Sequence, residues 1–312
     1  MDRPTPKIVC RLIVSIVLLA AIPSRAAKQE ISSLANSHPD YVALRGAELG
    51  QSFAVKDLTL TRDVGVFRLI SGTVTFLKPV LDKTPIAVFS GNGEFSLDPA
   101  TSQETHIISL YTSEKSVKEP FKQAVFCFTD DTDSEIRDVG SAGSAGQAAQ
   151  ILANFRSRMR SRRESPQSTT EAMLTGEDMD NLDADILAGM LNPNREKFFS
   201  AHIKGNRFED LRFHLRPFGG VPQMLSPEEV ALINFKPGGD MDGVWYLTHL
   251  KSEHEAGTAS AHEENRVVDV THYKIDAEIA GNRDLSAIVG IDLVALHEGT
   301  RVVKFVLCAY RT

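Results

Sequence analysis

Three histidines lie in a polar stretch toward the end of the chain, at His249, His254 and His262. The glutamates among them are Glu253, Glu255, Glu263 and Glu264. Imidazole nitrogens and carboxylate oxygens are common zinc ligands, so this stretch is a candidate metal site. The spacings of five and eight residues put no two of these histidines on one helical face, and nearby Gly257 and Ser260 indicate a loop. The spacing favours a solvated polar loop, and a zinc-dependent hydrolase that uses the three histidines is the alternative.

A second group of candidate ligands is the acidic turn at Asp130, Asp131, Asp133 and Glu135. Carboxylates at this density could bind calcium. The EF-hand loop, however, needs glycine at its sixth position and a glutamate at its twelfth, and here those positions hold Glu135 and Ser141. We therefore expect the turn to cap a helix.

A basic cluster follows, made of Arg156, Arg158, Arg160, Arg162 and Arg163. Such a cluster could dock on phosphate or on anionic lipid. The only aromatic residue beside it is Phe155, and the whole chain is acidic, with 34 Lys+Arg against 41 Asp+Glu and a net charge of −7. A solvated helix end is the favoured interpretation, and the charge balance argues against a nucleic-acid partner.

Nucleophiles and phosphate loops are not indicated by any motif. Gly91-Asn92-Gly93 lacks the strand-to-helix context of a phosphate loop and is typical of a hairpin turn. Ser71-Gly72 and Ser90-Gly91 lack the Gly-x-Ser-x-Gly pattern of a hydrolase elbow. The sequence thus predicts no catalytic residue and no cofactor, apart from zinc under the alternative.

The N-terminus predicts a signal peptide over residues 1–26. Arg3, Lys7 and Arg11 precede the apolar stretch Leu12–Ile22, and small residues that end at Ala26 follow it. The stretch is about half of the roughly 20 residues that a membrane-spanning helix needs. We expect a secreted or periplasmic chain with no membrane span after cleavage, whose net charge would be −10 once four basic residues and one acidic residue are removed.

The mature chain is expected to be mainly β, built from antiparallel sandwich or meander domains with a few short helices. Residues 27–139 form a predicted β-domain, residues 140–175 a linker with a helix near 146–160, and residues 176–312 a second β-rich domain. The strands expected in the first domain are Phe53–Leu60, Val66–Ile70, Thr73–Val80, Ile86–Ser90, Glu94–Leu97 and Gln123–Phe128. Cys127 and Cys308 remain after cleavage, and either a disulfide or two free thiols fit the pattern.

The second domain is expected to open with a helix at Leu182–Leu191 and a hairpin of Phe198–Ile203 with Leu211–Leu215. Ser226-Pro227-Glu228-Glu229 has the form of a capping box, which predicts a helix from Glu228 to Ile233. A meander over 265–310 follows, with strands at Arg266–Ala280, Leu285–Leu296 and Arg301–Ala309.

Apolar residues alternate with polar ones in this meander, at Tyr273, Ile275, Ala277 and Ile279. Alternation of this kind predicts that one face of the sheet is core. The last expected strand, Arg301–Ala309, has few polar positions to discourage pairing with a second molecule. Self-association through the C-terminal strands is therefore expected.

A family resemblance rests on two stretches. Tyr273–Ile279, with Leu285-Ser286-Ala287 and Arg301–Phe305, resembles the opening strands of aminopeptidase N-like zinc metallopeptidases, where a β-sandwich precedes the catalytic domain. Val55–Asp63, with Ala87–Gly93, is similar to the N-terminal extension of large bacterial members. Together the two cover about half of the mature chain.

The chain departs from that family in its chemistry. The family binds zinc through His-Glu-x-x-His, and here the fourth residue after His254, His262 and His297 is Thr258, Arg266 and Arg301, respectively. The resemblance therefore implies a non-catalytic N-terminal region or a truncated homologue, acting by binding a protein or a peptide.

Overall fold

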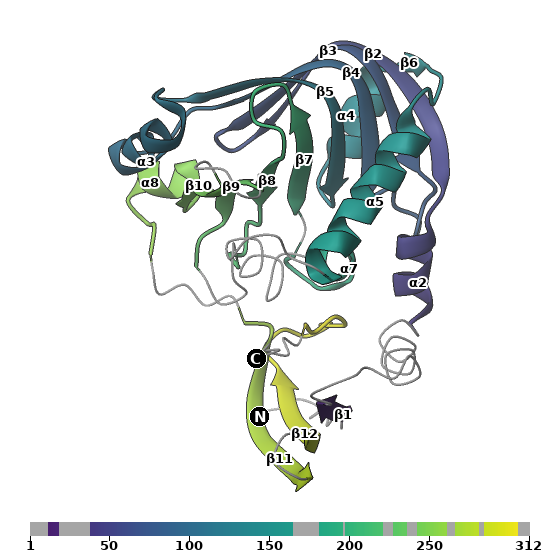
Figure 1. Ribbon diagram of the computed structural model, residues 1–312, viewed down its shortest axis with the longest axis vertical. Helices are drawn as coiled ribbons and strands as arrows, with labels where there is room; N and C mark the ends of the chain where they lie inside the picture. The colour runs from purple at the N-terminus through teal and green to yellow at the C-terminus, as the bar shows by residue number, and fades with distance from the viewer. Residues whose placement is uncertain are drawn as a thin grey trace, which may run out of the picture.

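The computed structural model describes residues 12–18, 38–164, 181–195, 197–220, 227–235, 242–260, 266–280 and 284–304. Their fold is mainly β, as predicted, and consists of two antiparallel sheets (Figure 1). The large sheet has nine strands in the order β10-β9-β8-β7-β5-β4-β3-β2-β6, and the small sheet has three in the order β1-β12-β11.

The strands of the large sheet are β2 (Leu49–Arg62), β3 (Gly65–Leu77), β4 (Ile86–Leu97), β5 (Val117–Phe128), β6 (Ser141–Ala142), β7 (Phe199–Gly205), β8 (Leu211–Leu215), β9 (Val230–Asn234) and β10 (Gly243–Thr248). The small sheet contains β1 (Leu12–Leu18), β11 (Val268–Ala280) and β12 (Asp284–Ala295). The helices are α2 (Pro39–Gly46), α3 (Ser102–Thr112), α4 (Thr132–Val139), α5 (Ala148–Glu164), α7 (Leu182–Leu191) and α8 (Lys251–Ala256). The predicted helices near 146–160 and over Leu182–Leu191 are thereby confirmed as α5 and α7.

The strands of the predicted meander are longer than the sequence suggested. Gly91-Asn92-Gly93 is predicted to be a hairpin turn, and Ser71-Gly72 separates two predicted strands. Strands β3 and β4 instead continue through them, with register shifts between Leu69 and Ser71 and between Ser90 and Gly93. Gly72 pairs with Gly91 across the two strands, and a Cβ on Gly72 would lie 2.5 Å from the carbonyl oxygen of Ser90. These glycines therefore allow a close approach of two backbones, which is the other common role of glycine in a strand.

Both faces of the large sheet are covered by apolar side chains. One face carries a phenylalanine cluster around Phe67, whose ring centroid lies 4.9 Å from that of Phe95 and 5.7 Å from that of Phe213. Helix α5 covers part of the opposite face, where Ile151 and Phe155 belong to the same buried cluster as Val125 of β5. Figure 1 shows α5, α7 and α2 along this side and α3 with α8 beside β10.

A single sheet runs through both predicted β-domains. β5 pairs with β7, so strands from 27–139 and from 176–312 share one hydrogen-bonded ladder. The predicted hairpin is confirmed, because β7 pairs with β8 from Phe199↔Leu215 to Ile203↔Leu211. Residues 165–180, which include part of the predicted linker, lie outside the described residues.

The helix predicted from Glu228 to Ile233 is wrong. Val230–Asn234 forms β9, which pairs with β8 on one side and β10 on the other, and all five of its residues are buried. A run that is buried on both faces carries no alternation, so periodicity could not separate it from a helix behind a capping box.

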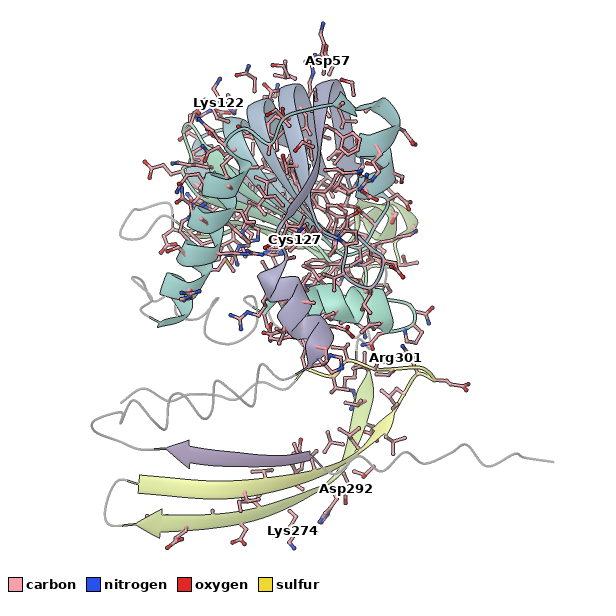
Figure 2. All side chains as sticks on the ribbon, turned by 90° about the vertical axis from the view of Figure 1, so that its right-hand side faces the viewer. Asp57, Lys122, Cys127, Lys274, Asp292 and Arg301 are labelled. Atoms are coloured by element: carbon pink, nitrogen blue, oxygen red, sulfur yellow. The ribbon has the colours of Figure 1, made fainter. Side chains whose placement is uncertain are left out.

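The small sheet confirms two of the three predicted C-terminal strands. β11 pairs with β12 along nearly its whole length, but residues 301–304 form no strand, and Phe305 to Ala309 lie outside the described residues. The chain returns from β12 to the end of α7, where Oδ1 of Asn192 accepts hydrogen bonds of 2.8 Å from the N–H groups of Arg301 and Val302. Figure 2 places Lys274 and Asp292 on this sheet, away from the large one.

The predicted core face of the meander is not core. Tyr273, Ile275 and Ile279 lie on one face of β11, as their alternation requires, yet they are 56%, 64% and 73% exposed. Among the described residues no second layer buries these side chains, so the prediction that the face is buried was wrong although the prediction of a single face was correct.

The apolar stretch assigned to the signal peptide contains strand β1, which pairs with β12 from Leu12↔Ile291 to Leu18↔Leu285. Residues 1–11 and 19–37 lie outside the described residues. Among the residues that are described, no helix has the length and hydropathy needed to cross a membrane.

Candidate functional site

The candidate metal ligands meet where β9 begins and β10 ends. His249 directly follows β10, and Glu229 directly precedes β9. The ladder pairs Thr248 with Val230, and the N–H of Glu229 donates to the carbonyl of Thr248 at 3.3 Å. The pairing of two neighbouring strands thus sets Glu229 against His249.

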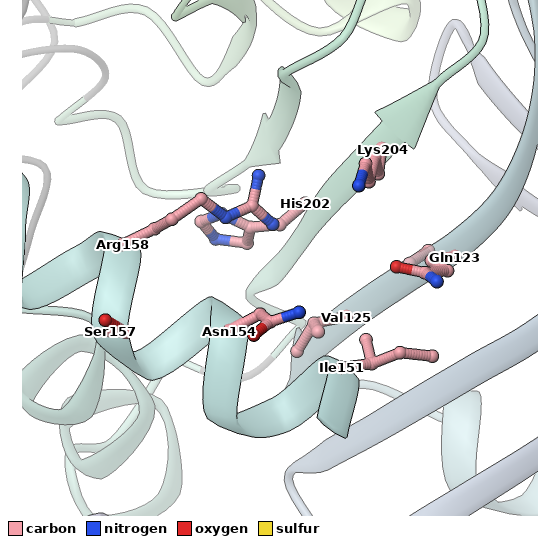
Figure 3. Close-up of a pocket in the computed structure, with 9 residues that line it drawn as sticks. Gln123, Val125, Ile151, Asn154, Ser157, Arg158, His202 and Lys204 are labelled. Carbon is pink, nitrogen blue, oxygen red and sulfur yellow. The ribbon is translucent and has the colours of Figure 1, made fainter. Parts of the chain in front are cut away.

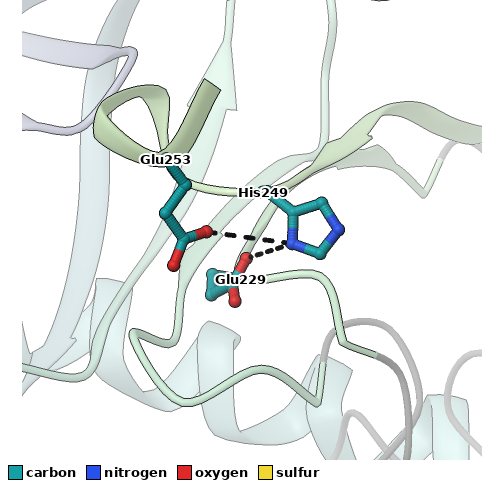
Figure 4. A group of neighbouring side chains, drawn as sticks. All are labelled: Glu229, His249 and Glu253. Carbon is teal, nitrogen blue, oxygen red and sulfur yellow. Dashed lines mark hydrogen bonds and ion pairs between the residues drawn. The ribbon is translucent and has the colours of Figure 1, made fainter. Parts of the chain in front are cut away.

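Helix α8 supplies the third member of this cluster, Glu253. Nδ1 of His249 lies 3.1 Å from Oε2 of Glu229 and 3.9 Å from Oε2 of Glu253, as Figure 4 shows. The side chain of Glu229 is 1% exposed, that of His249 14% and that of Glu253 27%. The cluster is therefore closed at Glu229 and reaches the surface at Glu253.

The other predicted histidines stand elsewhere. His254 lies on α8, but its Nε2 is 2.8 Å from Oγ1 of Thr248, and the group of potential ligands found among the described residues does not include it. His262 lies outside the described residues. The expected solvated loop is only partly present, since Lys251–Ala256 is helical and His249 is mostly buried.

The sequence does not indicate that Glu229 is a potential metal ligand, because its capping-box pattern places this residue at the start of a helix. The signal that could have found it is the antiparallel pairing of two buried strands, Val230–Asn234 and Gly243–Thr248, which brings the start of one beside the end of the other.

A polar pocket of about 260 Å³ lies between α5 and strands β5 and β7 (Figure 3). The side chains that line it include Gln123, Asn154, Ser157, Arg158, His202 and Lys204. Nδ1 of His202 accepts a hydrogen bond of 3.1 Å from Nε of Arg212, and its Nε2 lies 3.3 Å from Oγ of Ser200. Both ring nitrogens of His202 thus have a polar neighbour within 3.3 Å, so neither is free to accept a proton from a serine of the pocket such as Ser157.

The acidic turn leads into helix α4, as expected, but the N-cap residue Asp131 makes no side-chain capping hydrogen bond. Oδ1 of Asp130 accepts from the N–H of Thr132 at 3.0 Å, at the start of α4. Its Oδ2 forms an ion pair of 2.6 Å with Nε of Arg62, and Glu135 lies 2.9 Å from another nitrogen of the same guanidinium. Two of the four carboxylates, Asp130 and Glu135, therefore neutralise a buried arginine.

The arginine cluster lies on α5, and two of its members pack back onto the protein. Arg156 donates to the carbonyl of Ala47 at 2.8 Å, and Arg158 pairs with Asp210 at 3.2 Å. Arg160 is exposed, as expected for a solvated helix end. The side chains of Arg162 and Arg163 lie outside the described residues.

Cys127 is a free cysteine, buried in β5. Burial raises the pKa of its thiol, which keeps the group protonated and unreactive. Cys308, its predicted disulfide partner, lies outside the described residues.

No family model, curated protein or solved structure matches the chain. The resemblance to aminopeptidase N-like metallopeptidases stays a prediction, and the function has to be argued from the geometry of the described residues.

Proposed function

We propose that this chain is a secreted, non-enzymatic β-rich module that binds another protein through the exposed apolar face of β11. The observation that carries the proposal is the row Tyr273, Ile275 and Ile279, each more than half exposed on one face. In this proposal the module resembles the non-catalytic N-terminal part of an aminopeptidase N-like metallopeptidase.

The face extends across both strands in register. Tyr273 pairs with Ile291, Ile275 with Val289, and Ala277 with Ala287, so apolar residues of β12 lie beside those of β11. Ile291 is only 8% exposed and the other two are partly buried, so the exposed part of the face belongs to β11. The opposite face carries mostly polar side chains, among them Lys274, Asp276 and Glu278. A sheet with one apolar face normally buries that face against a second layer.

The chemistry of the face defines its partner. Exposed aliphatic and aromatic side chains in contiguous rows mark protein interaction sites, and burying them removes apolar area from water at about 25 cal/mol per Å². The matching surface is therefore the apolar face of another sheet or of an amphipathic helix, which would supply the missing second layer.

The predicted hydrolase built on His249, His254 and His262 receives less support. It requires the three imidazoles to converge on one ion, whereas the Nε2 of His254 pairs with Oγ1 of Thr248, and of the two histidines that are described only His249 joins the carboxylate cluster. Binding is accordingly the function that the described residues favour.

The experiment is site-specific photo-crosslinking of the secreted chain in its native host, with a photoreactive residue at position 275 or at position 288. Ile288 is the matched control, because it is 50% exposed and pairs with Asp276 on the opposite face. We expect a defined crosslinked partner from position 275 that disappears when Ile279→Lys is added, and none from position 288.

Equal crosslinking from the two faces would contradict the proposal. Zinc-dependent release of amino acids from peptides by the purified protein, abolished by a chelator, would overturn its non-enzymatic part.

A further inference from the structure

We propose that Glu229, His249 and Glu253 form a binding site for one divalent transition-metal ion of the zinc class. The three residues come from the start of β9, the end of β10 and helix α8, and their ligand atoms all lie within 4.8 Å of one another. The proposed site is independent of the apolar face of the small sheet.

The spacing of the ligand atoms fits a tetrahedral ion. With bonds of about 2.0–2.1 Å, two ligands of a tetrahedral zinc ion lie roughly 3.3 Å apart. The nitrogen of His249 lies 3.1 Å from Oε2 of Glu229 and 3.9 Å from Oε2 of Glu253. Coordination would require the carboxylate of Glu253, whose side chain is 27% exposed, to move toward His249 and Glu229.

The choice of metal follows from the donors. One imidazole with two carboxylates suits zinc and related transition metals, whereas calcium and magnesium prefer oxygen ligands alone. Three protein ligands leave a fourth position for water.

Burial makes the carboxylates suitable for a cation. The side chain of Glu229 is 1% exposed and its backbone is fixed by hydrogen bonds to both neighbouring strands, to Thr248 and to Arg216. Oε2 of Glu253 is itself buried and accepts no hydrogen bond. Two carboxylates that face one imidazole carry an excess of negative charge, which a divalent ion would neutralise more completely than a protonated histidine does.

A bound ion would fasten α8 to the sheet. This six-residue helix has no side-chain hydrogen bond at its N-cap and no buried residue of its own. Coordination by Glu253 would connect it to β9 and β10, so metal binding should protect residues 251–256 and raise the melting temperature.

The test uses the untagged full chain, dialysed against chelator and titrated with Co²⁺, whose visible spectrum reports tetrahedral coordination, and with Zn²⁺ by calorimetry. We expect one ion per chain, competition between the two metals, and a loss of affinity of at least about tenfold in His249→Gln and in Glu253→Gln.

The matched control is Glu255→Gln. Glu255 lies on the same helix, is exposed and faces Lys251 at 4.0 Å, so its loss should leave binding unchanged. His254→Gln serves the same purpose for the neighbouring imidazole. Glu253→Gln avoids the risk that a change at buried Glu229 unfolds the protein, and circular dichroism confirms the fold of each variant.

Absence of saturable binding in the folded protein, or equal losses in Glu253→Gln and Glu255→Gln, would overturn the site. Neither result bears on the apolar face, because none of these residues belongs to the small sheet.

Discussion

Acid should destabilise this fold through one histidine in β8. His214 is fully buried, and neither of its ring nitrogens has a hydrogen-bond partner. Burial lowers the pKa of His214 well below 6.5, and the positive charges of Arg212 and Arg216 lower it further. His202 is the nearest other imidazole, with its ring centroid 6.2 Å away.

The sign of the pH effect follows from proton uptake. In the unfolded chain this histidine titrates near about 6.5, whereas in the folded chain it stays neutral, so below that pH the unfolded state binds a proton that the folded state does not. Stability contributed by neutral His214 is present above about pH 6.5 and falls as the pH drops, by at most about 1.4 kcal/mol for each pH unit, until the pH reaches the lowered pKa of the folded state.

The assay is urea unfolding at pH 7.5, 6.5, 5.5 and 4.5 for the native chain and for His214→Leu. Other groups also titrate in this range, so the quantity that matters is the difference between the two proteins. We expect His214→Leu to be nearly unchanged at pH 7.5 and to gain stability relative to the native chain below about pH 6.5, by at most about 1.4 kcal/mol per pH unit. His106→Leu, at an exposed position on α3, should show no such gain. Parallel loss of stability by the native chain and His214→Leu down to pH 4.5 would refute the reasoning.

Three further outcomes are expected. Gly91→Ala should lower the free energy of unfolding by about 2 kcal/mol in urea titrations, because the added Cβ would clash with the carbonyl oxygen of Ser71. The control is Gly46→Ala, which has open space around it and should change the free energy of unfolding by less than about 1 kcal/mol. Asp130→Asn should lower the free energy of unfolding by about 3 kcal/mol, because it removes the negative charge that pairs with the buried guanidinium of Arg62. Glu135→Gln should lower it by less than about 1 kcal/mol, because Glu135 is more exposed; a reversed order would contradict this account. If the signal peptide is removed, β12 loses its pairing with β1. The β12 amides that face β1 should then exchange hydrogen faster in the mature chain than in a precursor whose cleavage is blocked, whereas the β12 amides bonded to β11 should stay protected in both.

Local sequence patterns predicted most elements of this fold. Apolar runs between turn residues indicated the meander, and helical spacing indicated α5, because both signals depend on residues close in sequence. The errors came where two patterns compete. At Gly72 and Gly91 the same residue type serves a turn or a close approach of two strands, and only the pairing of β3 with β4 decides between them.

The candidate metal site was only half visible for a related reason. His249 and Glu253 are four residues apart on the chain, so proximity alone found them. Glu229 comes from another strand, and its place beside His249 depends on the register of β9 against β10. Register is fixed by the hydrogen bonds of the whole ladder, which no local pattern records.

The apolar face of β11 has the sequence pattern of a buried strand although its side chains are exposed. Alternation along Tyr273, Ile275 and Ile279 arises wherever one face of a strand is shielded from water, and it does not record whether the shield belongs to the same molecule. Folding of the described residues leaves these side chains largely exposed, so they gain little from burial within the chain. Exposed apolar rows otherwise promote aggregation without stabilising the fold, which is why the proposed function gives them a role in association. Under that proposal, the alternation that predicted a core from the sequence would mark an interface.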